Sequence, residues 1–201
     1  YIAAMKKKGW LCGLNHPAWS RQSTEEVNGI TGIDTFEVYN HGSFKLYNNG
    51  DGQSHYSIYL AEGKRAWATA VDDNHAGFRE DGTISVTDDT LGGFIMMSMP
   101  QLTYADFADA LENGRFYAST GPEIKELWFE NGYVHIKTSE AARIVCSYGL
   151  RRARCAQNAD GTPVTEATFT VEPNVDYFRI TVIDGQGRTA DTNAFFVDTL
   201  L

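Results

Sequence analysis

Four side chains of types that bind divalent metal ions lie in or just after apolar segments in the first half of the chain. His16 follows the apolar run that ends at Leu14, Glu37 lies inside the next run, and Asp73 and His75 follow a third. Imidazole nitrogen and carboxylate oxygen together suit Zn, Mn, Fe and similar ions. These four residues are our candidate metal ligands, with Asp73 and His75 as candidate catalytic residues.

Taken singly, each of these residues also has an ordinary structural explanation. A histidine before Pro17 can be a loop residue, and residues 72–75 can form a capped turn. Glu37 can be satisfied by a salt bridge, although a buried carboxylate is costly unless it is paired or coordinated. Arg79 has a planar set of donors that could hold an anionic substrate group, or it could be a solvated loop residue.

The segments around these residues alternate between strand-like and helix-like patterns. Strands are expected at residues 10–14, 33–39, 66–71 and 94–99, and helices at residues 54–62 and 102–113, the second capped by Thr103. Such alternation is typical of parallel sheets and barrels, in which the carboxyl ends of the strands share one face. We therefore expect the four candidate ligands to converge.

Beyond residue 122 the pattern changes to short alternating segments separated by turn residues. Asn131-Gly132 and similar pairs supply hairpin turns. The expected strands lie at residues 127–129, 133–137, 143–148, 167–171, 177–183 and 194–197. The sequence thus predicts an α/β domain over residues 1–122 and a small antiparallel β-sandwich over residues 123–201.

Several motifs together resemble the PHP (polymerase and histidinol phosphatase) family of metal-dependent hydrolases, in the branch with a C-terminal β-rich domain. They are Asn15-His16-Pro17, FEVYN at residues 36–40, AVDDNH at residues 70–75 and ALENGRFYASTGP at residues 110–122. The resemblance implies an α/β fold, the later half of a distorted seven-stranded α/β barrel followed by the β-sandwich. It also implies two or three divalent ions (Zn, Mn or Fe), with His16, Glu37, Asp73 and His75 as ligands.

The activity implied by the resemblance is hydrolysis of a small phosphorylated or ester substrate, preferably a phosphate ester, by metal-activated hydroxide. The opening His-x-His pair of this family has no counterpart in the chain. The missing N-terminal half of the barrel, as a separate chain or segment, or a second subunit is the expected partner, and the chain alone is expected to be inactive. The alternative is a non-catalytic binding or structural module, for which Trp10, Trp19, Trp67 and Trp128 offer aromatic surface.

Composition narrows the function classes further. The 201 residues contain 17 Lys and Arg against 26 Asp and Glu, a net charge of −9, which argues against a nucleic-acid backbone as the partner. No apolar run approaches the ~20 residues of a membrane-spanning helix. Three cysteines (Cys12, Cys146, Cys155) favour free thiols in a reducing compartment and hence a cytoplasmic protein, with a Cys146–Cys155 bridge across a tight turn as the alternative.

Overall fold

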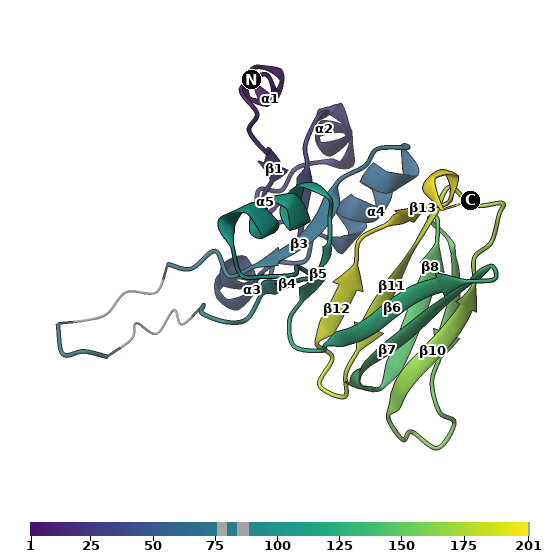
Figure 1. The fold of residues 1–201 in the computed structure, drawn as a ribbon. Coiled ribbons are helices and arrows are strands. Elements are labelled where there is room, and N and C mark those ends of the chain that lie inside the picture. Colours follow the sequence, from purple (N-terminus) through teal and green to yellow (C-terminus); the bar gives the residue numbers. More distant parts are fainter. Residues whose placement is uncertain (76–79, 84–88, 201) are drawn as a thin grey trace.

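The computed structural model describes residues 1–75, 80–83 and 89–200, which form three β-sheets and five α-helices (Figure 1). Strands hold 36% of the residues and helices 20%. Most strand pairs are antiparallel, so the expected fold class, a partial α/β barrel of parallel strands followed by a small β-sandwich, is wrong. Among the described residues, parallel pairing is confined to the first three strands, because the next two strands pair antiparallel with each other and with a strand near the C-terminus.

The parallel part of the fold is a sheet of three strands in the order β1-β2-β3. Its core is aromatic, since Phe36 lies with its ring centroid 5.2 Å from that of Tyr56 and 5.4 Å from that of Tyr59. The strands are β1 (Gly13–Leu14), β2 (Thr35–Asn40) and β3 (Trp67–Val71). β2 and β3 lie close to predicted runs, whereas β1 covers only the last two residues of the strand predicted at residues 10–14, where Trp10 is exposed.

The helices are short, and the second, third and fifth of them are capped by side chains of types that favour helix starts. Ser23 and Thr103 accept hydrogen bonds from backbone N–H groups of the first turns of α2 and α5. Among the described residues, no helix has the length and apolar character needed to cross a membrane. The helices are α1 (Ile2–Lys6), α2 (Thr24–Gly29), α3 (His41–Tyr47), α4 (Gln53–Ala61) and α5 (Tyr104–Glu112).

A seven-stranded sheet and a three-stranded sheet pack on each other in the C-terminal part (Figure 1). Their shared core includes Ile136 from one sheet and Ile144 and Phe178 from the other. The larger sheet has the order β4-β5-β12-β11-β8-β9, with β13 on β11, and the smaller has the order β10-β7-β6. The strands are β4 (Phe94–Met97), β5 (Phe116–Ser119), β6 (Ile124–Glu130), β7 (Tyr133–Ala141), β8 (Arg143–Tyr148), β9 (Arg152–Ala156), β10 (Val164–Thr170), β11 (Tyr177–Ile183), β12 (Thr189–Thr192) and β13 (Phe195–Phe196).

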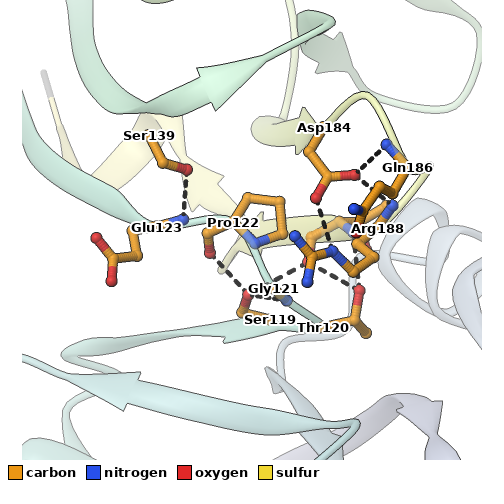
Figure 2. Close-up of polar contacts among 10 residues, drawn as sticks. Ser119, Thr120, Gly121, Pro122, Glu123, Ser139, Asp184, Gln186 and Arg188 are labelled. Atoms are coloured by element: carbon orange, nitrogen blue, oxygen red, sulfur yellow. Dashed lines mark hydrogen bonds and ion pairs between the residues drawn. The ribbon is translucent and has the colours of Figure 1, made fainter.

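Residues 119–122 form the turn that connects β5 to β6, and Figure 2 shows how it is held. The Thr189 backbone N–H donates to Thr120 Oγ1 at 2.8 Å, and the Thr120 N–H donates to the Thr189 carbonyl at 2.8 Å. Gly121 leaves room for Arg188, since a Cβ there would lie 2.6 Å from Arg188 Nε. β4 and β5, before this turn, share the seven-stranded sheet with β12 and β11 from the C-terminal part, whereas β6, directly after it, belongs to the three-stranded sheet. A division at residue 122 stays a prediction.

The three cysteines are free thiols. In the β8–β9 hairpin, Cys146 lies opposite Arg154, and Cys155 lies opposite Val145. Because side chains alternate between the two faces of a strand, this offset of one residue buries Cys146 and exposes Cys155. The alternative of a Cys146–Cys155 bridge is therefore wrong.

The two hairpin cysteines should differ sharply in reactivity. Burial raises the pKa of the Cys146 thiol to about 11, so at pH 8 it carries almost no thiolate, the form that reacts. With Ellman's reagent we expect Cys155 to react rapidly and Cys146 to react only after unfolding in guanidinium. Cys155→Ser should remove a fast phase that Cys146→Ser leaves intact, and the reverse pattern would contradict the strand register.

Candidate functional site

The end of β2 contains a β-bulge that redirects the chain into α3. Glu37 pairs with Thr69 and Tyr39 pairs with Ala70, so Val38 is the extra residue. Bulges bend a strand and re-aim its side chains, and they are frequent beside active sites. Three residues after Glu37, Asn40 ends the strand and caps α3 by accepting a 2.8 Å hydrogen bond from the Ser43 N–H.

The Asn40 side chain joins the carboxyl ends of two parallel strands. Its Nδ2 donates to Glu37 Oε2 at 3.1 Å and to Asp73 Oδ2 at 3.0 Å. Glu37 Oε2 also accepts a 2.7 Å hydrogen bond from the His16 backbone N–H. Residues that follow β1, β2 and β3 are thereby connected through one amide and one carboxylate.

Glu37 is a buried carboxylate with opposing influences on its charge. Burial raises its pKa above the usual value, and the negative charge of Asp73 acts in the same direction. The hydrogen bonds from Asn40 and from the His16 N–H act against this rise. Such a carboxylate gains from a nearby cation, because a positive charge offsets the cost of burying the negative one.

Three of the four predicted ligands line one cavity of about 340 Å³, namely His16, Asp73 and His75. Trp19 and Tyr47 form its aromatic wall, and the Trp19 ring meets His16 edge to face with centroids 5.1 Å apart. The fourth, Glu37, does not line the cavity and contacts it through the His16 backbone. The remaining predicted site residue, Arg79, lies outside the residues that the structure describes.

Each histidine of the cavity has one ring nitrogen engaged by a neighbour. His75 Nδ1 lies 2.6 Å from the Asp73 carbonyl oxygen, and His16 Nδ1 lies 2.9 Å from Ser20 Oγ. Because a carbonyl only accepts, Nδ1 of His75 carries a proton, and in the neutral form of the ring the lone pair is then on Nε2. This arrangement is typical of metal-binding histidines, whose second nitrogen donates to a carbonyl or carboxylate.

The backbone is unusual at two of the cavity residues. His16 has a φ of 33° and Asp73 a φ of 49°, in the left-handed region that non-glycine residues rarely adopt. Such conformations cost free energy and tend to cluster at functional sites, where the surrounding structure enforces them. Here hydrogen bonds at the His16 N–H and at the Asp73 carboxylate and carbonyl hold both residues in place.

Asp72, the neighbour of Asp73, fixes the chain that passes next to β3. Its carboxylate accepts hydrogen bonds of 2.6–2.9 Å from the backbone N–H groups of Leu91, Gly92 and Gly93. The buried Asp89 carboxylate accepts a 2.8 Å hydrogen bond from the His75 N–H. The sequence alone did not lead us to assign positioning roles to Asp72, Asp89 or Asn40. For Asn40, the signal in the sequence was an asparagine directly between an apolar strand and a helical segment.

The convergence stops short of a complete metal site. Within residues 1–75, 80–83 and 89–200, no three His, Cys, Asp or Glu side chains are grouped so that they could hold an ion. The donor types and the protonation of His75 fit a metal ion. An ion held here would need donors in addition to those that the described residues bring together.

No protein-family model matches the chain, and no curated protein or solved structure matches it. The likeness to PHP hydrolases thus stays a prediction based on short motifs. The tryptophans considered for a binding module do not share this cavity, since Trp19 lines it while Trp10, Trp67 and Trp128 do not.

Asn40 should contribute more to stability than an ordinary helix cap. Asn40→Ala removes the cap and leaves two carboxylates without their shared donor, which we expect to cost about 2–4 kcal/mol. Thr103→Ala is the matched control, because Thr103 caps α5 and the change should cost only about 1 kcal/mol. Urea unfolding measures both free energies, and equal losses would contradict the role of Asn40 as a link.

A second variant separates the amide donor from the cap. Asn40→Asp keeps an oxygen for the Ser43 N–H but places a third carboxylate next to Glu37 and Asp73. Repulsion raises the pKa values of this cluster in the folded state, so the folded protein binds more protons than the unfolded one. The loss of stability relative to wild type should therefore shrink as the pH falls from 7 to 5, and a loss independent of pH would contradict this reading.

Proposed function

We propose that the cavity lined by His16, Asp73 and His75 is the catalytic centre of a metal-dependent hydrolase, with a phosphate ester as the preferred substrate and a carboxyl ester as the other possibility. The observation that carries the proposal is the meeting of these side chains, from segments that follow β1 and β3, at one cavity with strained backbone at two of them. The likeness to PHP hydrolases agrees with this function.

The residues have distinct roles in this proposal. His75 and His16 offer ring nitrogens and Asp73 offers a carboxylate to a divalent ion such as Zn, Mn or Fe. When bound, the ion supplies Lewis acidity and lowers the pKa of water toward neutrality. Glu37 positions His16 through its backbone N–H, and Asn40 orients the carboxylates of Glu37 and Asp73.

Local charge also favours cations over anions when the site is empty. Glu37, Asp72, Asp73 and Asp89 all lie at this end of the parallel sheet, where they accept hydrogen bonds from the Asn40 amide or from the backbone of residues 75 and 91–93. A concentration of carboxylates raises the local concentration of cations. A phosphorylated substrate would then bind after the metal ions have neutralised the site.

We further propose that a partner segment or a second subunit completes the ligand set. Among the described residues β1 pairs only with β2, which leaves its other edge available to a partner. Large apolar side chains are exposed, with Tyr47 of the cavity wall 62% and Trp10, before β1, 60% accessible. Such surface is typical of a face that another polypeptide covers.

Metal binding by the 201-residue chain tests the site directly. With only the donors that the chain itself brings together, we expect weak binding of Mn²⁺, seen as quenching of the fluorescence of Trp19 beside His16, with calorimetry to report the affinity. His16→Ala, Asp73→Asn and His75→Ala should each weaken binding about tenfold or more. His135→Ala is the control, because His135 lies on β7 of the three-stranded sheet. Equal affinities in all four variants would refute the site.

Hydrolysis tests the chemistry separately from binding. We expect slow metal-dependent cleavage of bis(p-nitrophenyl) phosphate only when the partner that supplies the remaining ligands is present, and the same side-chain changes should abolish it. Metal binding without turnover by the chain alone would agree with an incomplete site. Absence of both metal binding and turnover would instead favour the non-catalytic binding module.

A further inference from the structure

A second and larger cavity, here called the junction cleft, lies on the other side of α3. It has a volume of about 770 Å³ and lies between the start of α3 and the hairpin of β11 and β12. Its walls come from both parts of the fold, with Tyr39 and Phe44 on one side and Arg179 and Asp191 on the other. Small-molecule sites are common where two such parts meet.

The cleft contains a carboxylate that is almost completely buried. Asp191 is only 2% exposed, and its Oδ1 accepts a 2.6 Å hydrogen bond from Thr181 Oγ1. Burial raises the pKa of Asp191, while the positive charge of Arg179 opposes this rise. Burying a carboxylate costs free energy, so its retention at a cavity wall indicates a use other than packing.

Arg179 is held in a fixed orientation by α4. Its guanidinium donates to Gln53 Oε1 at 2.6 Å and to Ser57 Oγ at 2.8 Å, and it lies 5.4 Å from the centre of the Tyr56 ring. In the part of the chain that the structure describes, neither Arg179 nor Asp191 forms an ion pair. A guanidinium with five N–H donors thus retains hydrogen-bonding capacity toward the cleft.

The charges of the lining cancel, which separates this cleft from the acidic candidate metal site. Asp51 and Asp191 supply two negative charges, and Arg179 and Arg188 supply two positive ones. Arg188 is already paired with Asp184, Nε to Oδ2 at 2.7 Å, as Figure 2 shows. Because this pairing neutralises Arg188, the cleft has no excess of positive charge that would attract phosphate.

One wall of the cleft is aromatic. The rings of Tyr39 and Phe44 lie with centroids 5.6 Å apart, and Phe44 is 44% exposed. Tyr39 OH contacts His41 Nδ1 at 2.8 Å, and Gly92 packs directly on the His41 ring. The wall is therefore fixed, and it offers aromatic surface to a ligand with an apolar side.

We propose that the junction cleft binds a neutral polyhydroxylated ligand of the sugar class. Hydroxyl groups both donate and accept, so they can pair with Asp191, Arg179 and Thr181, while the C–H face of a sugar ring packs against Tyr39 and Phe44. This inference does not depend on the proposed hydrolase, because none of its residues lines the candidate metal site.

Titration of the 201-residue chain with neutral sugars tests the proposal. The probes are glucose, galactose, xylose, maltose and cellobiose, followed by saturation-transfer NMR and calorimetry, with glycine and inorganic phosphate as competing ligand classes. We expect saturable one-to-one binding of at least one sugar. Saturable binding of glycine or phosphate in place of the sugars, or no sugar binding by the folded chain, would overturn the proposal.

Matched variants then locate the binding. Arg179→Gln and Thr181→Val should each weaken sugar binding about tenfold. This is the loss expected when one hydrogen bond is removed, either to a charged group or to the hydroxyl that pairs with a charged group. Arg154→Gln and Thr168→Val are the controls, because both residues lie on strands away from the cleft.

Folding of each variant is checked by circular dichroism. A substitution of the buried Asp191 is prone to misfold. Phe44→Ala, at an exposed position, is therefore the third cleft variant. Unchanged affinity in all three cleft variants, or equal losses in the controls, would show that the sugar binds elsewhere.

Discussion

The buried amide of Asn40 holds together the part of the molecule in which both cavities lie. It is 1% exposed, and it donates to two carboxylates while its oxygen caps α3. Glu37 is buried whereas Asp73 is exposed, and two carboxylates that accept from the same amide repel each other. A shared donor between them lowers that cost, and it fixes the ends of β2 and β3 relative to the start of α3.

The placement of α3 decides which residues reach which cavity. Gly42 and Ser43 line the candidate metal site, whereas His41 and Phe44 line the junction cleft. A Cβ at Gly42 would lie 2.9 Å from the Asp73 carbonyl oxygen, so the first turn of α3 packs closely on the segment that carries Asp73. One short helix thus forms a common wall, and its position is set by a cap and a close backbone contact.

Local patterns predicted the elements but not the way they pair. Runs at residues 33–39 and 66–71, the Thr103 cap and the Asn131-Gly132 turn are found in the structure. The β5–β12 pairing joins residues about 70 positions apart, and β12 (TADT) and β9 (RARCA) lack an apolar pattern. The fold class therefore could not be obtained from periodicity. The convergence of His16, Asp73 and His75 on one cavity could be predicted because these residues follow strands. The hydrogen bond from Asn40 to Asp73, 33 residues away, is a tertiary contact that no local pattern encodes.

The shared wall does not by itself couple the two cavities. Coupling between sites requires an element with two arrangements whose equilibrium both ligands bias. α3 is held by the Asn40 cap, by the contact at Gly42 and by the Gly42 N–H, which donates to the Asp72 carbonyl at 2.8 Å. Asp72 in turn fixes residues 91–93 through three backbone hydrogen bonds, and Gly92 packs on His41. Both ends of this wall are therefore fixed. A ligand in one cavity has no second arrangement of α3 to favour, and the two sites are expected to bind their ligands independently.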